Sequence, residues 1–108
     1  MMYNKTVKSD NVCFNMKGRF VFSDHMQFKD ILDYIENDAV GAVRLDFKEV
    51  EFIDSAALGL LLLAKEKSEK AGKRFVLERP VGQVAKMFKI SRFQDMFDIV
   101  EDGSANAR

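Results

Sequence analysis

The sequence predicts a single α/β domain built on a mixed β-sheet. β-prone runs alternate along the chain with segments of helical periodicity. The run 42–47 is apolar almost throughout, which is typical of a strand buried on both faces. At 108 residues the chain is long enough for one hydrophobic core and too short for two. We therefore expect about four to five strands packed with about four helices, the central strands parallel and the first two an antiparallel hairpin.

The first third of the chain predicts a hairpin and then a helix. β-prone pieces within 3–16 flank Ser9-Asp10-Asn11, which suits a turn, and Lys17-Gly18 is expected to end the pair before an extended piece at 19–22. Ser23 or Asp24 then caps a helix. Its apolar face recurs at three- and four-residue steps through His25, Phe28, Ile31, Leu32 and Ile35. On that face, His25 is expected to be a packed structural histidine.

The middle of the chain predicts strand, loop and helix. Residues 42–47 form the strand, a polar turn follows, and a leucine-rich helix runs from about Ser55 to Ala71, where Gly72 ends it.

Shorter elements complete the predicted domain. We expect a strand at 74–78, a loop at 80–82, a helix through Val84 and Phe88, and a short helix or turn before an edge strand at 93–100. The domain thus spans residues 1–102, and the small polar residues 103–108 are expected to form a flexible C-terminal tail.

Composition excludes several classes of function. The 17 basic residues balance the 17 acidic ones, so no net charge attracts nucleic acid or an anionic membrane. The longest apolar run, 56–64, is shorter than the roughly 20 residues that span a bilayer, and the amino terminus lacks a secretion signal. We therefore expect a cytoplasmic protein without membrane insertion. The lone Cys13 fits a reducing compartment and is expected to be a small buried hydrophobe.

Catalytic and ligand-binding motifs are also missing. Ser55 lacks the Gly-x-Ser-x-Gly context of a hydrolase nucleophile, and His25 is the only histidine that could act as its base. The sequence has no phosphate-binding glycine loop, no Cys/His set for zinc and no acidic calcium loop. We predict neither an enzyme nor a bound metal or cofactor.

Ser55 stands at a predicted helix start, where free backbone N–H groups and the helix dipole favour negative charge. Ser55 could be an ordinary N-cap, as could Asp54, and local sequence alone favours that interpretation over a phosphorylated serine.

A helical wheel at about 100° per residue divides the leucine-rich helix into two faces. Leu61 and Ala64 lie on a stripe of small residues suited to pack on a sheet, whereas Gly59, Leu62, Leu63 and Glu66 lie on the far side. A helix-start serine beside exposed leucines indicates a docking surface. Alternatively, a neighbouring helix covers these leucines.

The order of elements, with Leu45-Asp46-Phe47 and the segment from Val50 to Gly59, resembles the STAS domain family, in particular the anti-sigma factor antagonists of bacteria. Residues 72–77 and 84–90, with Phe93 and Phe97, extend the resemblance over nearly the whole chain. Phe22-Ser23-Asp24-His25 looks most like stand-alone members from Gram-negative bacteria.

This resemblance implies a partner switch. The serine that matches Ser55 is phosphorylated by a serine kinase of the histidine-kinase-like ATPase fold, often itself the anti-sigma factor, and a PP2C-type phosphatase removes the phosphate. The unmodified form binds the anti-sigma factor and the phosphorylated form does not. We expect the partner-binding residues to be Asp24, Asp54, Ala56, Gly59, Leu62, Leu63 and Glu66.

Two positions depart from the family pattern. Ala57 stands where a glycine is usual, and Val21 stands where many relatives carry an aspartate near the serine, a role that the nearby Asp24 could take. Two alternative functions stay open. One is a constitutive STAS subunit of a transport complex, in which Ser55 is only a cap, and the other is a nucleotide-binding STAS sensor that holds a ligand phosphate at the helix start.

Overall fold

The computed structural model describes residues 1–101, so the predicted tail at 103–108 lies outside the described residues. Within 1–101 the chain forms five strands, three α-helices and two short 3₁₀ turns. In chain order these are β1 (Met2–Lys8), β2 (Asn11–Phe20), a 3₁₀ turn (Phe22–Asp24), α1 (His25–Ile35), β3 (Ala42–Ile53), α2 (Ser55–Ala71), β4 (Arg74–Glu78), α3 (Gly82–Ile90), a second 3₁₀ turn (Phe93–Asp95) and β5 (Asp98–Val100).

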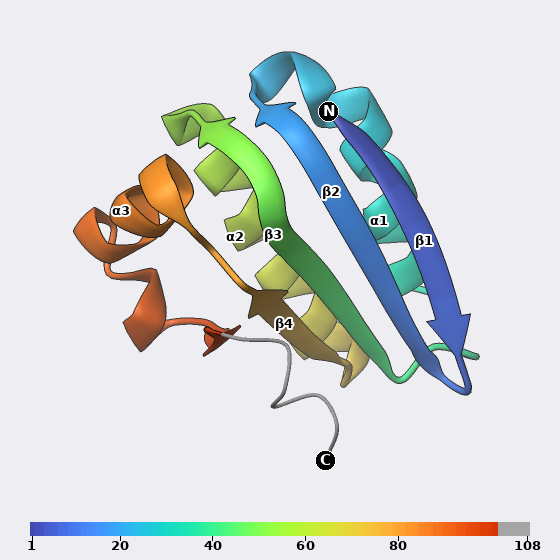
Figure 1. Ribbon diagram of the computed structural model, residues 1–108. Helices are drawn as coiled ribbons and strands as arrows, with labels where there is room; N and C mark the ends of the chain where they lie inside the picture. Colours follow the sequence, from blue (N-terminus) through green and yellow to red (C-terminus); the bar gives the residue numbers. More distant parts are fainter. Residues whose placement is uncertain (102–108) are drawn as a thin grey trace.

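The strands form one mixed sheet in the order β1-β2-β3-β4-β5 (Figure 1). β1 pairs antiparallel with β2, and every later pair is parallel. Each parallel connection passes through a helix, as is usual for such crossovers. The predicted α/β class is therefore confirmed, with the parallel central strands and the antiparallel hairpin. The short helix or turn expected before the edge strand is a single 3₁₀ turn.

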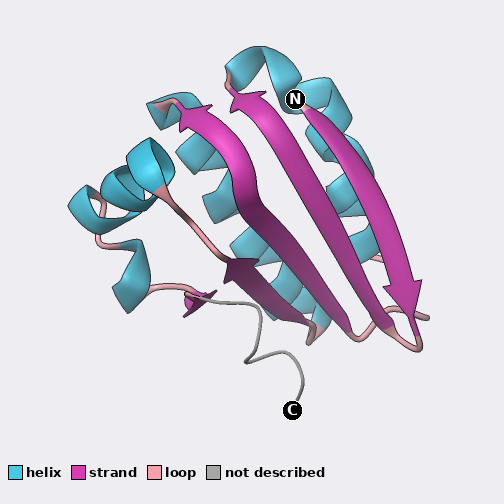
Figure 2. Ribbon diagram, viewed as in Figure 1, coloured by secondary structure: helices cyan, strands magenta, loops and turns pink. Residues whose placement is uncertain are grey.

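Helices α1 and α2 lie side by side on one face of the sheet, whereas the opposite face is open (Figure 2). Alternation along each strand sends every second side chain toward these helices. Val12 and Phe14 of β2 and Val43 and Leu45 of β3 are fully buried there. Phe28, Ile31 and Ile35 of α1 and Leu61 and Ala64 of α2 close the core from the other side.

Two strand boundaries differ from the prediction. β2 does not stop at Lys17-Gly18, because the strand continues through a β-bulge at this pair. The register of β2 against β3 shifts on both sides of the pair, and Gly18 adopts a φ of +86°. β3 does not stop at Phe47, because β2 pairs with it as far as Ile53. The segment that we expected to be a polar turn is thus strand.

Two residues predicted to be buried are not. His25 is exposed, and its ring stacks on Phe22 with ring centroids 5.0 Å apart, since the first turn of α1 lies beyond the core. Cys13 is half-buried, because the alternation of β2 directs its neighbours Val12 and Phe14 to the core and the thiol to the open face. Among residues 1–101, no helix has the length and apolar character needed to cross a membrane.

Candidate functional site

Ser55 is the first residue of α2, directly beyond the carboxyl end of β3. This place is at the top of Figure 1, where the paired ends of β2 and β3 meet at Phe20 and Ile53. The 3₁₀ turn that follows β2 lies beside it and contacts α2. Ser55 is exposed, so its hydroxyl is open to a modifying enzyme.

Asp54, and not Ser55, caps α2. One carboxylate oxygen of Asp54 accepts a hydrogen bond from the backbone N–H of Ala57 at 2.7 Å. The other accepts from the N–H of Phe22 at 3.2 Å. Asp54 therefore satisfies a free N–H of the helix and fastens the turn after β2 to the start of α2. Because Asp54 makes the capping hydrogen bond, Ser55 is not the N-cap of α2, and the interpretation of this serine as an ordinary N-cap is wrong.

The start of α2 suits a negative charge. α2 spans 17 residues, and its first turn contains no acidic side chain. The unpaired N–H groups and the helix dipole favour an anion there, and the capping carboxylate of Asp54 is the acidic group already at this end. A phosphate on the Ser55 hydroxyl would stand at this positive end of the helix.

The leucines that the wheel placed on the far side of α2 are uncovered. Leu62 is 41% exposed and Leu63 is 40% exposed, so no neighbouring helix within residues 1–101 buries them. Ala56, Gly59 and Glu66 are exposed on the same helix. We call these five residues of α2 the docking face.

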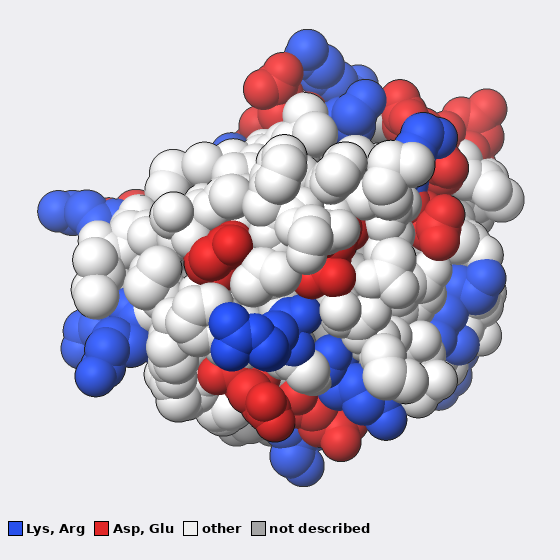
Figure 3. Space-filling view, turned by 90° about the horizontal axis from the view of Figure 1, so that it is seen from above, with Lys and Arg blue, Asp and Glu red and all other residues white. Residues whose placement is uncertain are grey.

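Sequence reasoning missed two apolar side chains at the same end of the molecule. Phe22 in the 3₁₀ turn is 56% exposed, and Met26 in the first turn of α1 is 68% exposed. Both belong to a segment that contacts α2. Seen from this end, a broad area of uncharged residues occupies the upper middle of the view and is bordered by charged side chains (Figure 3). Exposed apolar side chains grouped in this way are typical of a binding surface.

Asp24 holds the turn that follows β2. Its carboxylate accepts hydrogen bonds from the backbone N–H of Val21 at 2.9 Å and from the α-amino group of Met1 at 2.8 Å. Burial alone would raise the pKa of Asp24, but these two donors outweigh burial and lower it. In this arrangement Asp24 supports the segment that carries Phe22.

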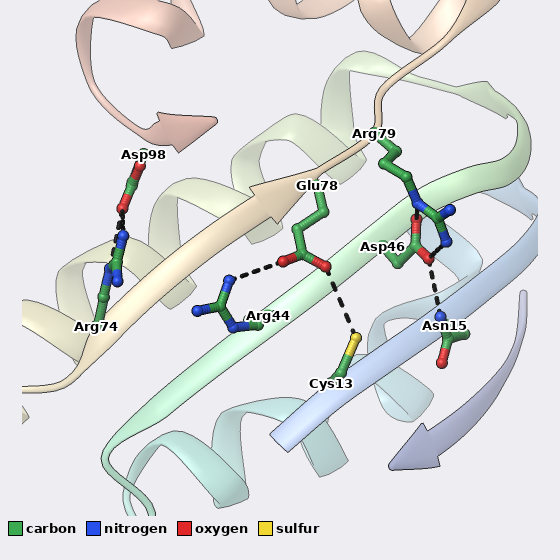
Figure 4. A network of polar contacts seen from close by, with 8 residues as sticks. All are labelled: Cys13, Asn15, Arg44, Asp46, Arg74, Glu78, Arg79 and Asp98. Carbon is green, nitrogen blue, oxygen red and sulfur yellow. Dashed lines mark hydrogen bonds and ion pairs between the residues drawn. The ribbon is translucent and has the colours of Figure 1, made fainter. Parts of the chain in front are cut away.

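A separate polar network lies on the open face of the sheet (Figure 4). Asp46 is 4% exposed and accepts hydrogen bonds from Arg79, from Asn15 at 2.8 Å and from the N–H of Lys48 at 3.1 Å. Burial would raise the pKa of Asp46, but these donors, with Arg79 the strongest, hold it below its usual value. The network therefore keeps a buried carboxylate ionised.

Glu78 and Cys13 complete this network. Glu78 is 3% exposed and forms an ion pair with Arg44 at 2.8 Å. The Cys13 thiol lies 3.9 Å from the same carboxylate. Burial, and then the carboxylates of Glu78 and Asp46, raise the pKa of Cys13 to about 11. No buried side-chain nitrogen or oxygen in the described part of the chain lacks a hydrogen-bond partner, which is typical of a polar network that stabilises a fold.

Comparison with known proteins identifies relatives over nearly the whole chain. A family model described as "Mlab, STAS domain" matches residues 5–101. The STAS-domain containing protein PA14_20770 of Pseudomonas aeruginosa is 30% identical over 84 residues, which are 78% of this chain and 82% of that protein.

Solved structures share the fold at lower identity. SpoIIAA, an anti-sigma factor antagonist, matches in its unphosphorylated form with a TM-score of 0.78 and 22% identity, covering 98% of this chain and 94% of that one. The phosphorylated form from Bacillus matches with a TM-score of 0.75 and 21% identity, covering 99% and 98%. A sulfate transporter family protein from Wolinella succinogenes matches with a TM-score of 0.76 and 20% identity, covering 92% and 83%.

Proposed function

The chain belongs to the STAS domain family, and from this we propose that it is a phosphorylation-controlled binding protein that acts like an anti-sigma factor antagonist. Ser55 is the proposed phosphoacceptor. The observation that carries the proposal is the exposed, non-capping serine at the start of α2, directly before Ala56, the first residue of the docking face. The fold that this chain shares with both forms of SpoIIAA supports the same assignment.

The geometry explains how one phosphate would control binding. Phosphorylation adds about −1.5 to −2 charges at neutral pH. The positive end of α2 tolerates this charge in the free protein. A partner packed on Leu62 and Leu63 would have to remove water from the phosphate, which costs binding free energy. The switch therefore acts on the complex and leaves the fold of the domain unchanged.

The proposed partner is an anti-sigma factor that is also a serine kinase of the histidine-kinase-like ATPase fold. A PP2C-type serine phosphatase would restore the binding form, and all three proteins would act in the cytoplasm. In this scheme the chain is a regulator and the enzymes are its partners. These assignments rest on the family and on the likeness to SpoIIAA.

A second function has its own support. The fold shared with the sulfate transporter family protein from Wolinella succinogenes favours a constitutive subunit of a transport complex. In that case the docking face would bind a transport component permanently, and Ser55 would carry no phosphate. The two functions therefore differ in their response to a charge at Ser55.

Affinity capture distinguishes them. Ser55→Ala and Ser55→Asp proteins, each expressed in the native host, are used as baits, and the captured proteins are identified by mass spectrometry. The double variant Ser55→Ala/Ser9→Asp adds the same charge in the exposed turn between β1 and β2 and is the matched control. We expect Ser55→Ala and this double variant to retain an ATPase-fold kinase that Ser55→Asp loses by at least about tenfold. Equal capture of a transport component by all three baits would contradict the switch.

A further inference from the structure

The edge of β3 that faces away from β2 is only partly covered by a strand. β4 pairs with β3 from Ala42 to Asp46, whereas β3 continues to Ile53. Backbone N–H and C=O groups along a buried edge need hydrogen-bond partners. The structure must therefore satisfy the last residues of β3 by another route.

At Ile53 this partner is the side chain of Gln83. The Gln83 Oε1 atom accepts a hydrogen bond from the N–H of Ile53 at 2.9 Å. Its Nε2 group donates to the C=O of Ile53 at 3.1 Å. One amide side chain thus makes both hydrogen bonds that a neighbouring strand would otherwise make. Ile53 itself is fully buried, so these backbone groups have little access to water.

Gln83 holds a residue that lies only two positions before Ser55 in the chain. Ile53 immediately precedes Asp54, the cap of α2, and is paired on its other side with Phe20 of β2. Gln83 lies in the first turn of α3, which packs on β3 where the rings of Phe47 and Phe88 meet with centroids 5.3 Å apart. The last residue of β3 is therefore held between a strand and a helix.

We propose that Gln83 is a positioning residue for Ser55. By holding the last residue of β3, Gln83 fixes the position of the Asp54 cap and, with it, that of the Ser55 hydroxyl. It couples α3 to the modification site although the two are almost thirty residues apart in the chain. That Gln83 fixes the end of β3 follows from its two hydrogen bonds to Ile53. That Gln83 affects phosphorylation of Ser55 rests on the proposed function.

Amide hydrogen exchange followed by NMR tests whether Gln83 fixes the end of β3. Gln83→Met keeps the length and helix propensity of the side chain but removes both hydrogen bonds. We expect exchange at Ile53 and Ala57 to accelerate roughly tenfold, while amides of β1 and β2 keep their rates. The exposed Gln94 provides the matched control, Gln94→Met, which should leave all rates unchanged. Unchanged exchange at Ile53 and Ala57, or equal acceleration throughout the domain, would overturn the inference.

A second variant covers the case in which Gln83→Met does not fold. Gln83→Glu has almost the same shape, and its carboxylate accepts from the N–H of Ile53 but cannot donate to the C=O. The second carboxylate oxygen then faces the C=O of Ile53 and repels it, so exchange at Ile53 and Ala57 should be faster than in the wild type. A wild-type rate at Ala57 would count against the inference.

The effect of Gln83 on phosphorylation is tested by the phosphate content of Ser55. Wild-type and Gln83→Met proteins are isolated from the native host under the same conditions and analysed by mass spectrometry. We expect the variant to lose Ser55 phosphate while its fold persists. If the wild type carries phosphate and the variant carries equally much, the coupling to phosphorylation is wrong. If neither carries phosphate, the proposed function fails, and the exchange rates still decide the positioning role.

Discussion

The carboxylate of Asp54 serves two segments of the chain at once, because one oxygen caps α2 through Ala57 and the other binds the N–H of Phe22. Replacing it removes both links. We expect Asp54→Ala to lower the free energy of unfolding by about 1–2 kcal/mol, as measured by urea denaturation. Ser55→Ala should change it by less than about 0.5 kcal/mol, since Ser55 is exposed and does not cap the helix. The reverse order of the two effects would show that the serine is the cap.

The ionised Asp46 predicts a dependence of stability on pH. Its pKa is lower in the folded protein than the value of about 3.9 in unfolded chains, so its contribution is complete above about pH 4 and is lost as pH falls through the folded pKa. Asp46→Asn should therefore be roughly 1.5–3 kcal/mol less stable than the wild type at neutral pH. Urea denaturation at several pH values should show this difference shrinking below pH about 4. A difference independent of pH would contradict the assignment.

Cys13 should be an unreactive thiol. Burial and the neighbouring carboxylates raise its pKa to about 11, so the nucleophilic thiolate is scarce at neutral pH. We expect iodoacetamide at pH 7.5 to alkylate the folded protein far more slowly than the protein unfolded in urea, with the modified fraction measured by intact mass. Similar rates in both states would indicate that the thiol is activated.

At the residue scale, the sequence was informative where neighbours in the chain are also neighbours in space. Asp54-Ser55 at a helix start could be predicted because β3 and α2 follow each other directly in the chain. The contribution of Gln83 could not be predicted, since Gln83 lies on α3, far from Ile53 in the chain, and only the folded structure brings the two together. His25 was misplaced because helical spacing identifies the apolar side of a helix but not where that helix leaves the core.

At the element scale, α2 carries the clearest agreement between pattern and structure. The wheel separated Leu61, which is fully buried, from Leu62, which is 41% exposed. These adjacent leucines form a matched pair for mutation. Leu62→Asp should stay within about 1 kcal/mol of the wild type in unfolding free energy and lose partner binding.

Leu61→Asp is the control and should destabilise the domain by at least about 3 kcal/mol, because it puts a charge into the core. Urea denaturation measures both variants, and affinity capture measures binding by Leu62→Asp. A large loss of stability in Leu62→Asp would mean that this residue belongs to the core and not to the docking face.

Strand ends were the least predictable feature of the elements. The polar residues Lys48, Glu49 and Glu51 looked like a turn, but they are exposed positions of a strand that β2 continues to pair. Likewise, a bulge at Gly18 resembles a strand break in the sequence. Both misjudgements have one cause, which is that pairing with a partner strand overrides local propensity.

At the scale of the whole molecule, the contacts that stabilise the domain lie on the faces of the sheet, and the proposed binding site lies at one end of it. One face packs on α1 and α2, the open face carries the Asp46 and Glu78 network, and the candidate site lies at the end where β2 and β3 finish. A phosphate at this end touches neither the core nor the network. Under the proposed function, phosphorylation would therefore change partner binding without a change of fold. The alternation of strands and helices was enough to predict this architecture but not the polar network across its open face.

The most direct test of the proposed switch is the modification state of Ser55 itself. Protein isolated from the native host in several growth states is analysed by intact-mass spectrometry, with peptide mapping across 53–65. We expect a fraction of molecules to be heavier by one phosphate, located on Ser55, and we expect this fraction to change with the state of the cell and to be absent from Ser55→Ala. If Ser55 is unmodified in every state, the phosphorylation switch is contradicted and the constitutive transport subunit becomes the better account.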